Sequence, residues 1–267
     1  MAAPLLLIGA GRMGGALLKG WLARGLGPVV VVETSPSKEL KALTHRGVRL
    51  LKRIEDAPAK PRVCVVALKP QILKVEAPRL RAIAVSGTPM ISIAAGSSIR
   101  LMRKAWGKSA HIIRTMPNTP GSIGEGISAL YAPPNATLAE RKLAESLLAA
   151  LGETVWVKRE ADIDTVTAVS GSGPAYVFLM VECLAAAARK EGLPTDVALK
   201  LARKTIIGAG ALLKADPAPA EELRRNVTSP KGTTEAALKI LMARNGLEPL
   251  IKKTVSAARR RARELAT

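Results

Sequence analysis

The chain has 267 residues and a formal net charge of +20, from 41 basic and 21 acidic residues. This length allows two modest domains or one large one. Hydrophobic residues make up 48% of the sequence and aromatic residues only 2%, which argues against disorder and predicts a core of aliphatic side chains.

The positive charge raises the question of nucleic-acid binding. The basic residues are spread along the whole chain, and only the C-terminal segment concentrates them. A solvated helix face explains this distribution better than a nucleic-acid interface. We therefore expect no nucleic-acid partner, although such a surface also attracts small anions.

Cysteine usage and the N-terminal segment bear on the cellular compartment. Cys64 and Cys183 lie in apolar patterns without metal-site or disulfide spacing, so we expect two buried thiols and no bound metal. The N-terminal run lacks a basic region and indicates a strand, not a signal peptide. The uncharged stretches 82–99 and 165–181 are broken by Gly and Pro, which argues against a membrane span. We expect a cytoplasmic protein with no membrane partner.

In the first half of the chain, short apolar runs alternate with helical patterns. Strands are expected at 5–8, 29–32, 63–68, 90–93, 112–113 and 155–157, and helices at 13–24, 37–45, from Pro70 onward and at 138–151. This alternation predicts βαβ units and a doubly wound, parallel α/β sheet of the Rossmann type.

Beyond about residue 160 the strand patterns cease. Helices are expected at about 174–190, 194–214, 218–226, 234–244 and 247–265. We therefore predict a dinucleotide-binding domain over residues 1–160 and an all-α domain over residues 161–267.

A glycine fingerprint follows the first strand. Its residues are Gly9, Ala10, Gly11, Arg12, Met13 and Gly14. The first glycine permits a tight turn, the second lets the backbone approach a diphosphate, and the third lets helix and strand pack closely. The position between a strand and a helix predicts a dinucleotide site.

The residues after the second strand leave the choice of cofactor open. Glu33 is placed to bind the ribose hydroxyls of NAD and to repel the 2′-phosphate of NADP, or it is an exposed strand-end carboxylate. Thr34 and Ser35 can instead donate hydrogen bonds to a phosphate, and Lys38 can offset the charge of Glu33.

Two further loops follow strands on the ligand-binding side of an open α/β sheet. One contains Ala67, Leu68, Lys69 and Pro70. The other is 116–120, in which two prolines flank Asn118, an amide suited to a place beside a nicotinamide ring or to ordinary turn chemistry.

The helical half contains two polar motifs. The string Ser170–Tyr176 is either an anion-binding nest or, as we favour, a point of close helix contact. The string Asn226–Glu235 places hydroxyls and a glycine before a helix start, where free N–H groups and the helix dipole suit a carboxylate, although an ordinary N-cap is the commoner use.

Five strings in this order and spacing resemble the pyrroline-5-carboxylate reductase family: GAGRMG, ALKPQ, RTMPNTP, SGSGPAY and NVTSPKGTTEAAL. The resemblance runs nearly end to end. It implies an N-terminal Rossmann domain and a C-terminal domain that dimerises by interleaving helices, in some members as five dimers. It also implies the reduction of 1-pyrroline-5-carboxylate to L-proline, the last step of proline biosynthesis, with NADPH or, alternatively, NADH.

The resemblance also implies roles for individual residues. Ala10, Arg12 and Met13 are expected to contact the diphosphate, Ser35 the adenosine ribose or its phosphate, and Leu68, Lys69, Ala95 and Asn226 the rest of the cofactor. Ser229, Gly232, Thr233 and Thr234 are expected to hold the substrate, with Glu160 as a weaker match. The chain departs from the family at Lys231, where members have glycine.

The residue chemistry is compatible with an imine substrate. An iminium carbon accepts hydride with little more than positioning and a hydrogen bond at nitrogen. His45 and His111 are both expected far from the ligand edge, so Thr234 is our candidate catalytic residue.

The alternatives are a reductase of a β-hydroxyacid or another cyclic imine, and a non-enzymatic nucleic-acid or dinucleotide-sensing protein. The alternative reductase should show a catalytic Lys in residues 174–189, which contain none. The nucleic-acid or dinucleotide-sensing protein should show a clustered basic face, whereas the basic residues are scattered.

Overall fold

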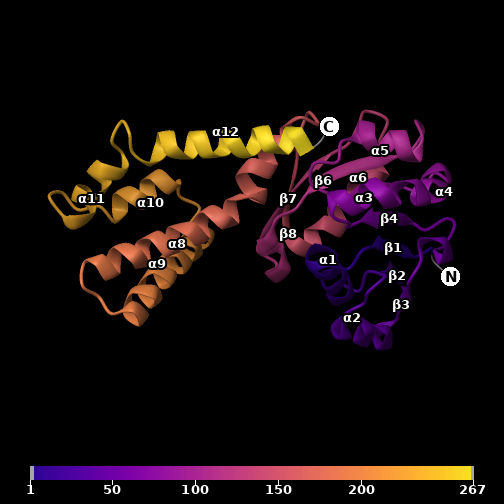
Figure 1. Cartoon of the computed structure of the whole chain (residues 1–267), viewed down its shortest axis with the longest axis horizontal. Helices are drawn as coiled ribbons and strands as arrows, with labels where there is room; N and C mark the ends of the chain where they lie inside the picture. Colours follow the sequence, from indigo (N-terminus) through magenta and orange to yellow (C-terminus); the bar gives the residue numbers. More distant parts are fainter. Residues whose placement is uncertain (1–2, 266–267) are drawn as a thin grey trace. The chain divides into compact units, whose positions relative to one another are not determined.

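The computed structural model describes residues 3–265 and divides into two compact units (Figure 1). The sheet unit comprises the chain up to Ser172 together with the segment from Ala258 onward, and the helical unit comprises Gly173–Ala257.

The sheet unit is built on one eight-stranded sheet with the order β3-β2-β1-β4-β5-β6-β7-β8. The strands are β1 Leu5–Ile8, β2 Val29–Val32, β3 Val48–Leu51, β4 Val63–Val66, β5 Met90–Ser92, β6 Ile112–Met116, β7 Gly126–Tyr131 and β8 Gly152–Trp156. The Rossmann-type class is confirmed, with two additions: β3 and β7 were not expected, and β7 runs antiparallel to β6. The short β6–β7 connection explains this reversal, since a parallel pair needs a longer crossover.

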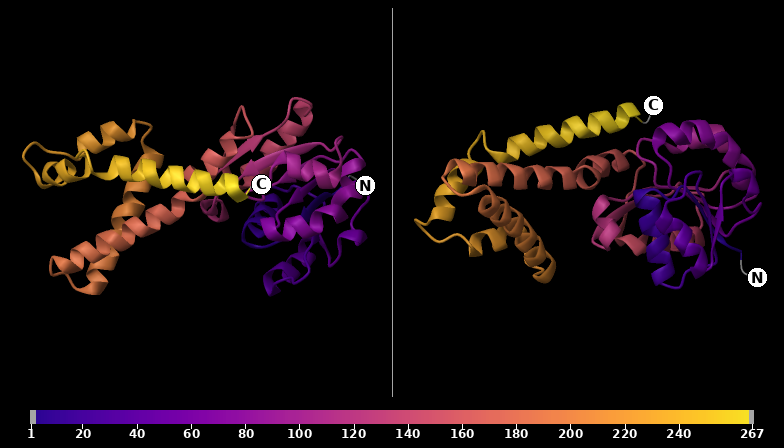
Figure 2. Two further views of the ribbon diagram at one scale, coloured as in Figure 1. Left: turned by 45° about the horizontal axis from the view of Figure 1, so that its top comes forward. Right: turned by 60° about the horizontal axis from the view of Figure 1, so that its bottom comes forward.

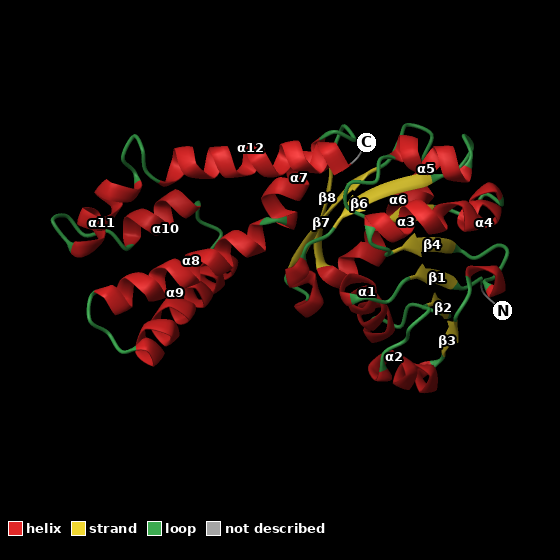
Figure 3. Cartoon of the chain, in the orientation of Figure 1, coloured by secondary structure: helices red, strands yellow, loops and turns green. Residues whose placement is uncertain are grey.

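Helices cover both faces of the sheet, which explains the continuous apolar runs of its central strands (Figure 3). In β1 the side chains alternate, with Leu5 and Leu7 facing α1 and α6 and with Leu6 and Ile8 facing α3, α4 and α5. The helices are α1 Arg12–Ala23, α2 Lys38–Ala42, α3 Pro70–Glu76, α4 Arg81–Val85, α5 Ile99–Trp106, α6 Leu138–Leu148 and α7 Asp162–Val166. Burial also raises the pKa of the Cys64 thiol, as expected for an inert core cysteine.

One fully buried tryptophan anchors each face of this core. On one face, the Trp21 indole N–H donates to the Leu147 carbonyl at 2.9 Å and so joins α1 to α6. On the other, the Trp106 N–H donates to the Ala77 carbonyl at 2.9 Å. Large rings with satisfied N–H groups can therefore be buried completely here.

The helical unit contains long helices with apolar side chains still exposed. Its helices are α8 Gly173–Lys190, α9 Thr195–Ala215, α10 Ala220–Asn226, α11 Thr233–Leu241 and α12 Leu247–Leu265. The part of α12 from Ala258 onward belongs to the sheet unit. Helices α8 and α9 lie side by side (Figure 2). Phe178 and Leu179 are exposed, and so is Cys183, which corrects the expectation of a buried thiol.

One helical stretch of the described residues, Asp162–Lys190, is long and apolar enough to cross a membrane by length and composition alone. That is weak evidence for a span, because the core helix of a soluble protein or a signal sequence passes the same test. Only 6% of its apolar window is buried within the chain.

We expect Trp21→Ala to lower the free energy of unfolding by about 3–5 kcal/mol, since it opens a cavity between α1 and α6. Urea denaturation followed by circular dichroism measures this change. The control is Ile123→Ala, at a side chain that is 78% exposed, where we expect a change within about 0.5 kcal/mol. Equal effects of the two substitutions would contradict this description of the core.

Candidate active site

The glycine fingerprint makes the turn between β1 and α1 possible. Gly9 has a φ of +88°, a conformation that favours glycine. A Cβ on Gly14 would collide with the Gly9 carbonyl oxygen, so close packing of helix on turn requires glycine there. A Cβ on Gly11, by contrast, meets nothing within 4 Å. The backbone at Gly11 is therefore open to a ligand.

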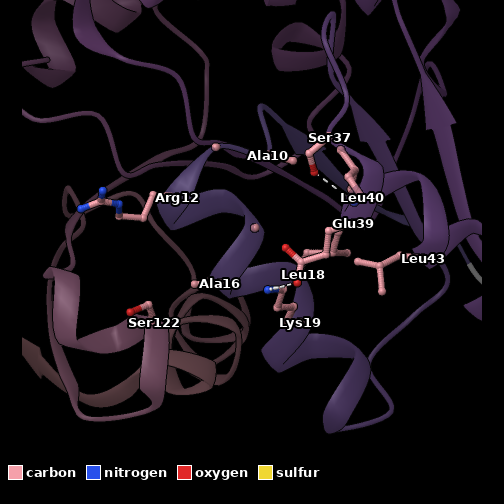
Figure 4. A pocket seen from close by; sticks show the side chains of 12 residues that line it. Ala10, Arg12, Ala16, Leu18, Lys19, Ser37, Glu39, Leu40, Leu43 and Ser122 are labelled. Carbon is pink, nitrogen blue, oxygen red and sulfur yellow. Dashed lines mark hydrogen bonds and ion pairs between the residues drawn. The ribbon is translucent and has the colours of Figure 1, made fainter.

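The N-terminus of α1 is free to bind an anion. Gly11 caps the helix without a side-chain hydrogen bond, and the first turn contains no acidic residue. The N–H groups of the first turn and the helix dipole thus face the opening above Gly11. Figure 4 shows the adjoining pocket, in which the side chains of Arg12 and Ser122 lie on one side of α1 and the Lys19–Glu39 ion pair on the other.

A cavity of about 440 Å³ adjoins this turn at the carboxyl ends of β1, β2, β3 and β4. Seven of the predicted cofactor residues line it: Gly9, Gly11, Glu33, Thr34, Ala67, Leu68 and Lys69. Three residues that the sequence analysis missed also line it, namely Lys52, Arg53 and Ile54. They follow β3, a four-residue strand in which Arg49 interrupts the apolar residues Val48, Leu50 and Leu51.

Glu33 is held by the fingerprint turn. Its carboxylate accepts hydrogen bonds from the Ala10 N–H at 2.9 Å and from the Ser35 N–H at 3.1 Å. The carboxylate thus faces the turn between β1 and α1 and keeps acceptor capacity for a hydroxyl group. Glu33 is therefore a structural link as well as a candidate ligand for ribose.

The loops after β4, β5 and β6 reach the same edge of the sheet, since these strands run parallel to β1. Pro70 occupies the first position of α3, as predicted, and Lys69 is its N-cap.

The Asn118 side-chain oxygen accepts a hydrogen bond from the Ile127 N–H at 3.0 Å and fixes the start of β7. Asn118 therefore has a turn role, and its amide N–H₂ group is not used in that bond. Ala95 lies half-buried in the loop after β5.

Glu160 belongs to a partly buried ion-pair network. The guanidinium of Arg114, whose side chain is 3% exposed, donates to Glu160 at 3.2 Å and to Asp164 at 3.3 Å. Glu160 also accepts the Ile99 N–H at 2.7 Å, at the first turn of α5. This network joins β6, α5 and α7, so the carboxylate predicted to approach the substrate is already paired within the sheet unit.

The string Ser170–Tyr176 spans a π-helical turn and the start of α8. A Cβ on Gly171 would lie 2.6 Å from the Met116 methyl group at the end of β6. Gly171 therefore serves close packing, but against the end of β6, whereas the favoured interpretation expected a close contact between helices.

In the helical unit, a tight turn precedes α11. The Gly232 N–H donates to the Ser229 carbonyl at 3.0 Å, and the central positions are Pro230 and Lys231. Lys231 has a φ of +61° and is the only non-glycine residue with positive φ among residues 3–265. A turn with proline first and positive φ second strongly favours glycine at the second position. The Lys231 N–H donates to the Glu235 carboxylate at 2.6 Å, which holds the turn on the helix.

Helix α11 begins with free donors. Gly232 caps it without a side-chain hydrogen bond, and the side chain of Ser229 leaves no room for a Cβ on Gly232. The first turn carries the hydroxyls of the exposed Thr233 and the half-buried Thr234. Asn226 ends α10 shortly before this turn. The arrangement suits a small carboxylate with one further polar atom.

The comparisons with known proteins agree with both units. Residues 5–96 match a family model described as an NADP oxidoreductase, coenzyme F420-dependent, and residues 160–265 match one described as pyrroline-5-carboxylate reductase dimerisation. With the Rossmann fold and the uncapped α1, the first match defines the chain as a nicotinamide-dinucleotide-dependent oxidoreductase.

Full-length relatives define it further. The pyrroline-5-carboxylate reductase of Pseudomonas aeruginosa is 37% identical over 100% of this chain and 98% of its own length, and that of Pisum sativum is 33% identical over 97% and 94%. A solved structure of the enzyme from Coxiella burnetii is 35% identical, covers 100% of both chains and has a TM-score of 0.91. One from Plasmodium falciparum, with NADP bound, is 27% identical over 99% of this chain and 98% of its own, with a TM-score of 0.83. The chain belongs to the pyrroline-5-carboxylate reductase family.

We expect two glycine substitutions in the fingerprint to fail in different ways. Gly11→Ala places its methyl group in open space, so thermal stability should stay unchanged while affinity for NADPH falls about tenfold or more. Gly14→Ala forces a collision with Gly9. We expect it to lower the free energy of unfolding by roughly 1–3 kcal/mol and therefore the melting temperature by several degrees. Calorimetric titration and thermal denaturation measure the two effects. A Gly11→Ala protein that binds NADPH normally would contradict the diphosphate assignment.

We expect Lys231→Gly to raise stability by about 0.5–1 kcal/mol, because glycine adopts positive φ without strain. Lys231→Ala removes the charge but keeps the strain, and should leave stability nearly unchanged. Denaturant titration of both variants against the unaltered protein distinguishes backbone strain from side-chain charge. Equal stabilisation by both substitutions would show that the charge, and not the φ angle, is responsible.

Proposed function

We propose that the chain reduces 1-pyrroline-5-carboxylate to L-proline with NADPH, with NADH as the alternative cofactor, as a cytoplasmic enzyme of proline biosynthesis. The observation that supports this most is the pair of uncapped helix N-termini, α1 and α11, each preceded by a turn in which glycine is required. One suits a diphosphate and the other a small carboxylate. Family membership supplies the identity of the substrate.

The sheet unit would hold the cofactor. The N–H groups of Arg12 and Met13 in the first turn of α1 bind the diphosphate, and Leu68 lines the cavity beside it. On the family resemblance, Ser35 binds the adenosine ribose or its phosphate and Ala95 lies toward the nicotinamide. When bound, the cofactor supplies a hydride. Asn118 and, from the helical unit, Asn226 are assigned to the cofactor on the family resemblance.

The substrate would be held by the start of α11. The N–H groups of Thr233 and Thr234 bind the carboxylate beside Ser229 and Gly232, and the Thr234 hydroxyl bonds the ring nitrogen. No strong acid is needed when the substrate binds as the protonated imine, because hydride addition to the carbon of C=NH⁺ gives the neutral amine of proline without a further proton. The histidines are engaged elsewhere: His111 pairs with Glu140 at 2.6 Å, and His45 lies exposed before Gly47.

Glu160 has a less direct role in this proposal. Because its carboxylate bonds Arg114 and the Ile99 N–H, it would act by fixing the loop after β5, which includes Ala95. That makes Glu160 a positioning residue and not a group that contacts substrate.

The proposed assembly is a homodimer through the helical unit, with five dimers forming a decamer. The match to a dimerisation family model and the exposed apolar side chains of α8 and α9 support the dimer, and the decamer rests on the family resemblance. Light scattering should give a mass ten times the 28.1 kDa of one chain. A mass of twice that value would support the dimer and exclude the decamer.

The activity itself is tested by following the absorbance of NADPH, and separately of NADH, in the presence of pyrroline-5-carboxylate. We expect oxidation of NADPH that depends on the substrate and produces proline. Activity with a β-hydroxyacid or another cyclic imine, and none with pyrroline-5-carboxylate, would favour the alternative reductase.

We expect Thr234→Ala to lower kcat/KM by about 10- to 100-fold, since it removes the hydrogen bond at the ring nitrogen. Thr234→Ser keeps the hydroxyl and should retain most of the activity. Steady-state kinetics of both variants, with melting temperatures as a folding control, measure this. An unchanged kcat/KM in Thr234→Ala would defeat the assignment.

A further inference from the structure

Beyond Glu33, the cavity next to the fingerprint turn has a basic wall. Lys52 and Arg53 line it from the end of β3, and Arg79 lines it from the helical segment after α3. The hydrogen bond from the Glu33 N–H to the Leu51 carbonyl, at 2.9 Å, brings the end of β2 beside the end of β3. The two residues that follow Leu51 therefore flank the segment of Glu33, Thr34 and Ser35.

Arg79 is not available as a cation for a ligand. Its guanidinium pairs with Glu55 at 2.7 Å and with Glu76 at 2.8 Å. The hydrogen bond between the two side chains lowers the pKa of Glu55 and raises that of Arg79. The charge of Arg79 is thus offset by two neighbouring carboxylates.

The charges of Lys52 and Arg53, unlike that of Arg79, are not offset by close carboxylates. Both are exposed, and Lys52 has no ion-pair partner within the described part of the chain. Arg53 has only a 3.5 Å contact with Glu55, whose other oxygen is taken by Arg79, and its side chain is 67% exposed. These two cations can turn toward a ligand at little cost.

The acidic group in this part of the cavity is restrained. The Glu33 carboxylate is bound by the N–H groups of Ala10 and Ser35, on the side of the fingerprint turn. Backbone donors disperse part of its charge. The hydroxyls of Thr34 and Ser35, both exposed, remain free to donate to an anion between Glu33 and the end of β3.

We propose that Lys52 and Arg53 form the recognition site for the 2′-phosphate of NADPH and override the repulsion that Glu33 would exert on it. This inference rests on the proposed function and deepens it, since it names the residues that select the cofactor. A phosphate monoester carries nearly two negative charges, which an ammonium and a guanidinium group match in charge and in donors. NADH lacks that phosphate and gains nothing from either side chain.

The test uses the full chain and two adenine nucleotides that differ by the 2′-phosphate, 2′,5′-ADP and 5′-AMP, in calorimetric titrations. In the double variant Lys52→Ala/Arg53→Ala we expect the affinity for 2′,5′-ADP to fall about tenfold or more and that for 5′-AMP to change less than about twofold. The same contrast should hold for NADPH against NADH. An equal loss for both nucleotides, or no loss for either, would overturn the proposal.

A matched control removes two positive charges outside the cavity. Arg49→Ala/Lys60→Ala alters exposed residues on the same strand and the following loop, and should leave the affinity for 2′,5′-ADP within about twofold of the unaltered protein at equal salt. A loss as large as in Lys52→Ala/Arg53→Ala would mean that overall charge is responsible, and would overturn the proposal. Lys52→Arg/Arg53→Lys keeps both charges and should preserve the preference.

Because nucleotide binding is measured without turnover, the two proposals can fail separately. A protein that discriminates 2′,5′-ADP through Lys52 and Arg53 but does not oxidise NADPH with pyrroline-5-carboxylate would refute the proposed substrate and retain the cofactor site. A protein that turns over with equal efficiency on NADPH and NADH, before and after the double substitution, would refute the cofactor site alone.

Discussion

The site depends on one close approach, between the Gly9 carbonyl and Gly14 at the junction of β1 and α1. No side chain fits between them, and this lets α1 begin directly at the carboxyl edge of the sheet. The first N–H groups of the helix then remain without internal acceptors. Because Gly11 and Arg12 are exposed, water can bind these donors in the free protein, and their alignment with the helix dipole suits an anion such as a diphosphate.

The same physical principle operates a second time, at α11. Gly232 lies against Ser229, and the helix again starts without a side-chain cap. Electrostatic binding at two helix starts is well suited to a reaction that joins a dinucleotide and a small acid, and to one in which the electrophile needs little further activation. In the proposed function, such a reaction does not require a histidine acid. Lys231 has a positive φ although it is not a glycine, so its surroundings must hold the turn in this conformation. The hydrogen bond from its N–H to the Glu235 carboxylate is one such restraint.

Much of this could be predicted from the sequence, because the signals were local. Four consecutive valines identified β2, and proline and glycine marked the helix ends, so the helices of the second half deviate by only a few residues. The strand β3 was missed because Arg49 interrupts its apolar pattern, and Lys52 and Arg53 were missed with it. The pairing of Glu160 with Arg114 could not be foreseen either, since the two are far apart in sequence and meet only through tertiary packing.

The proposed function requires that the first turns of α1 and α11 bind the two anions of one reaction. A crystal structure of the protein with NADP⁺ and L-proline tests it most directly. The account predicts diphosphate oxygens at the N–H groups of Arg12 and Met13, the proline carboxylate at those of Thr233 and Thr234, and the nicotinamide C4 atom facing the proline ring. A diphosphate bound away from Gly11, or a carboxylate bound away from α11 in every subunit arrangement, would contradict it.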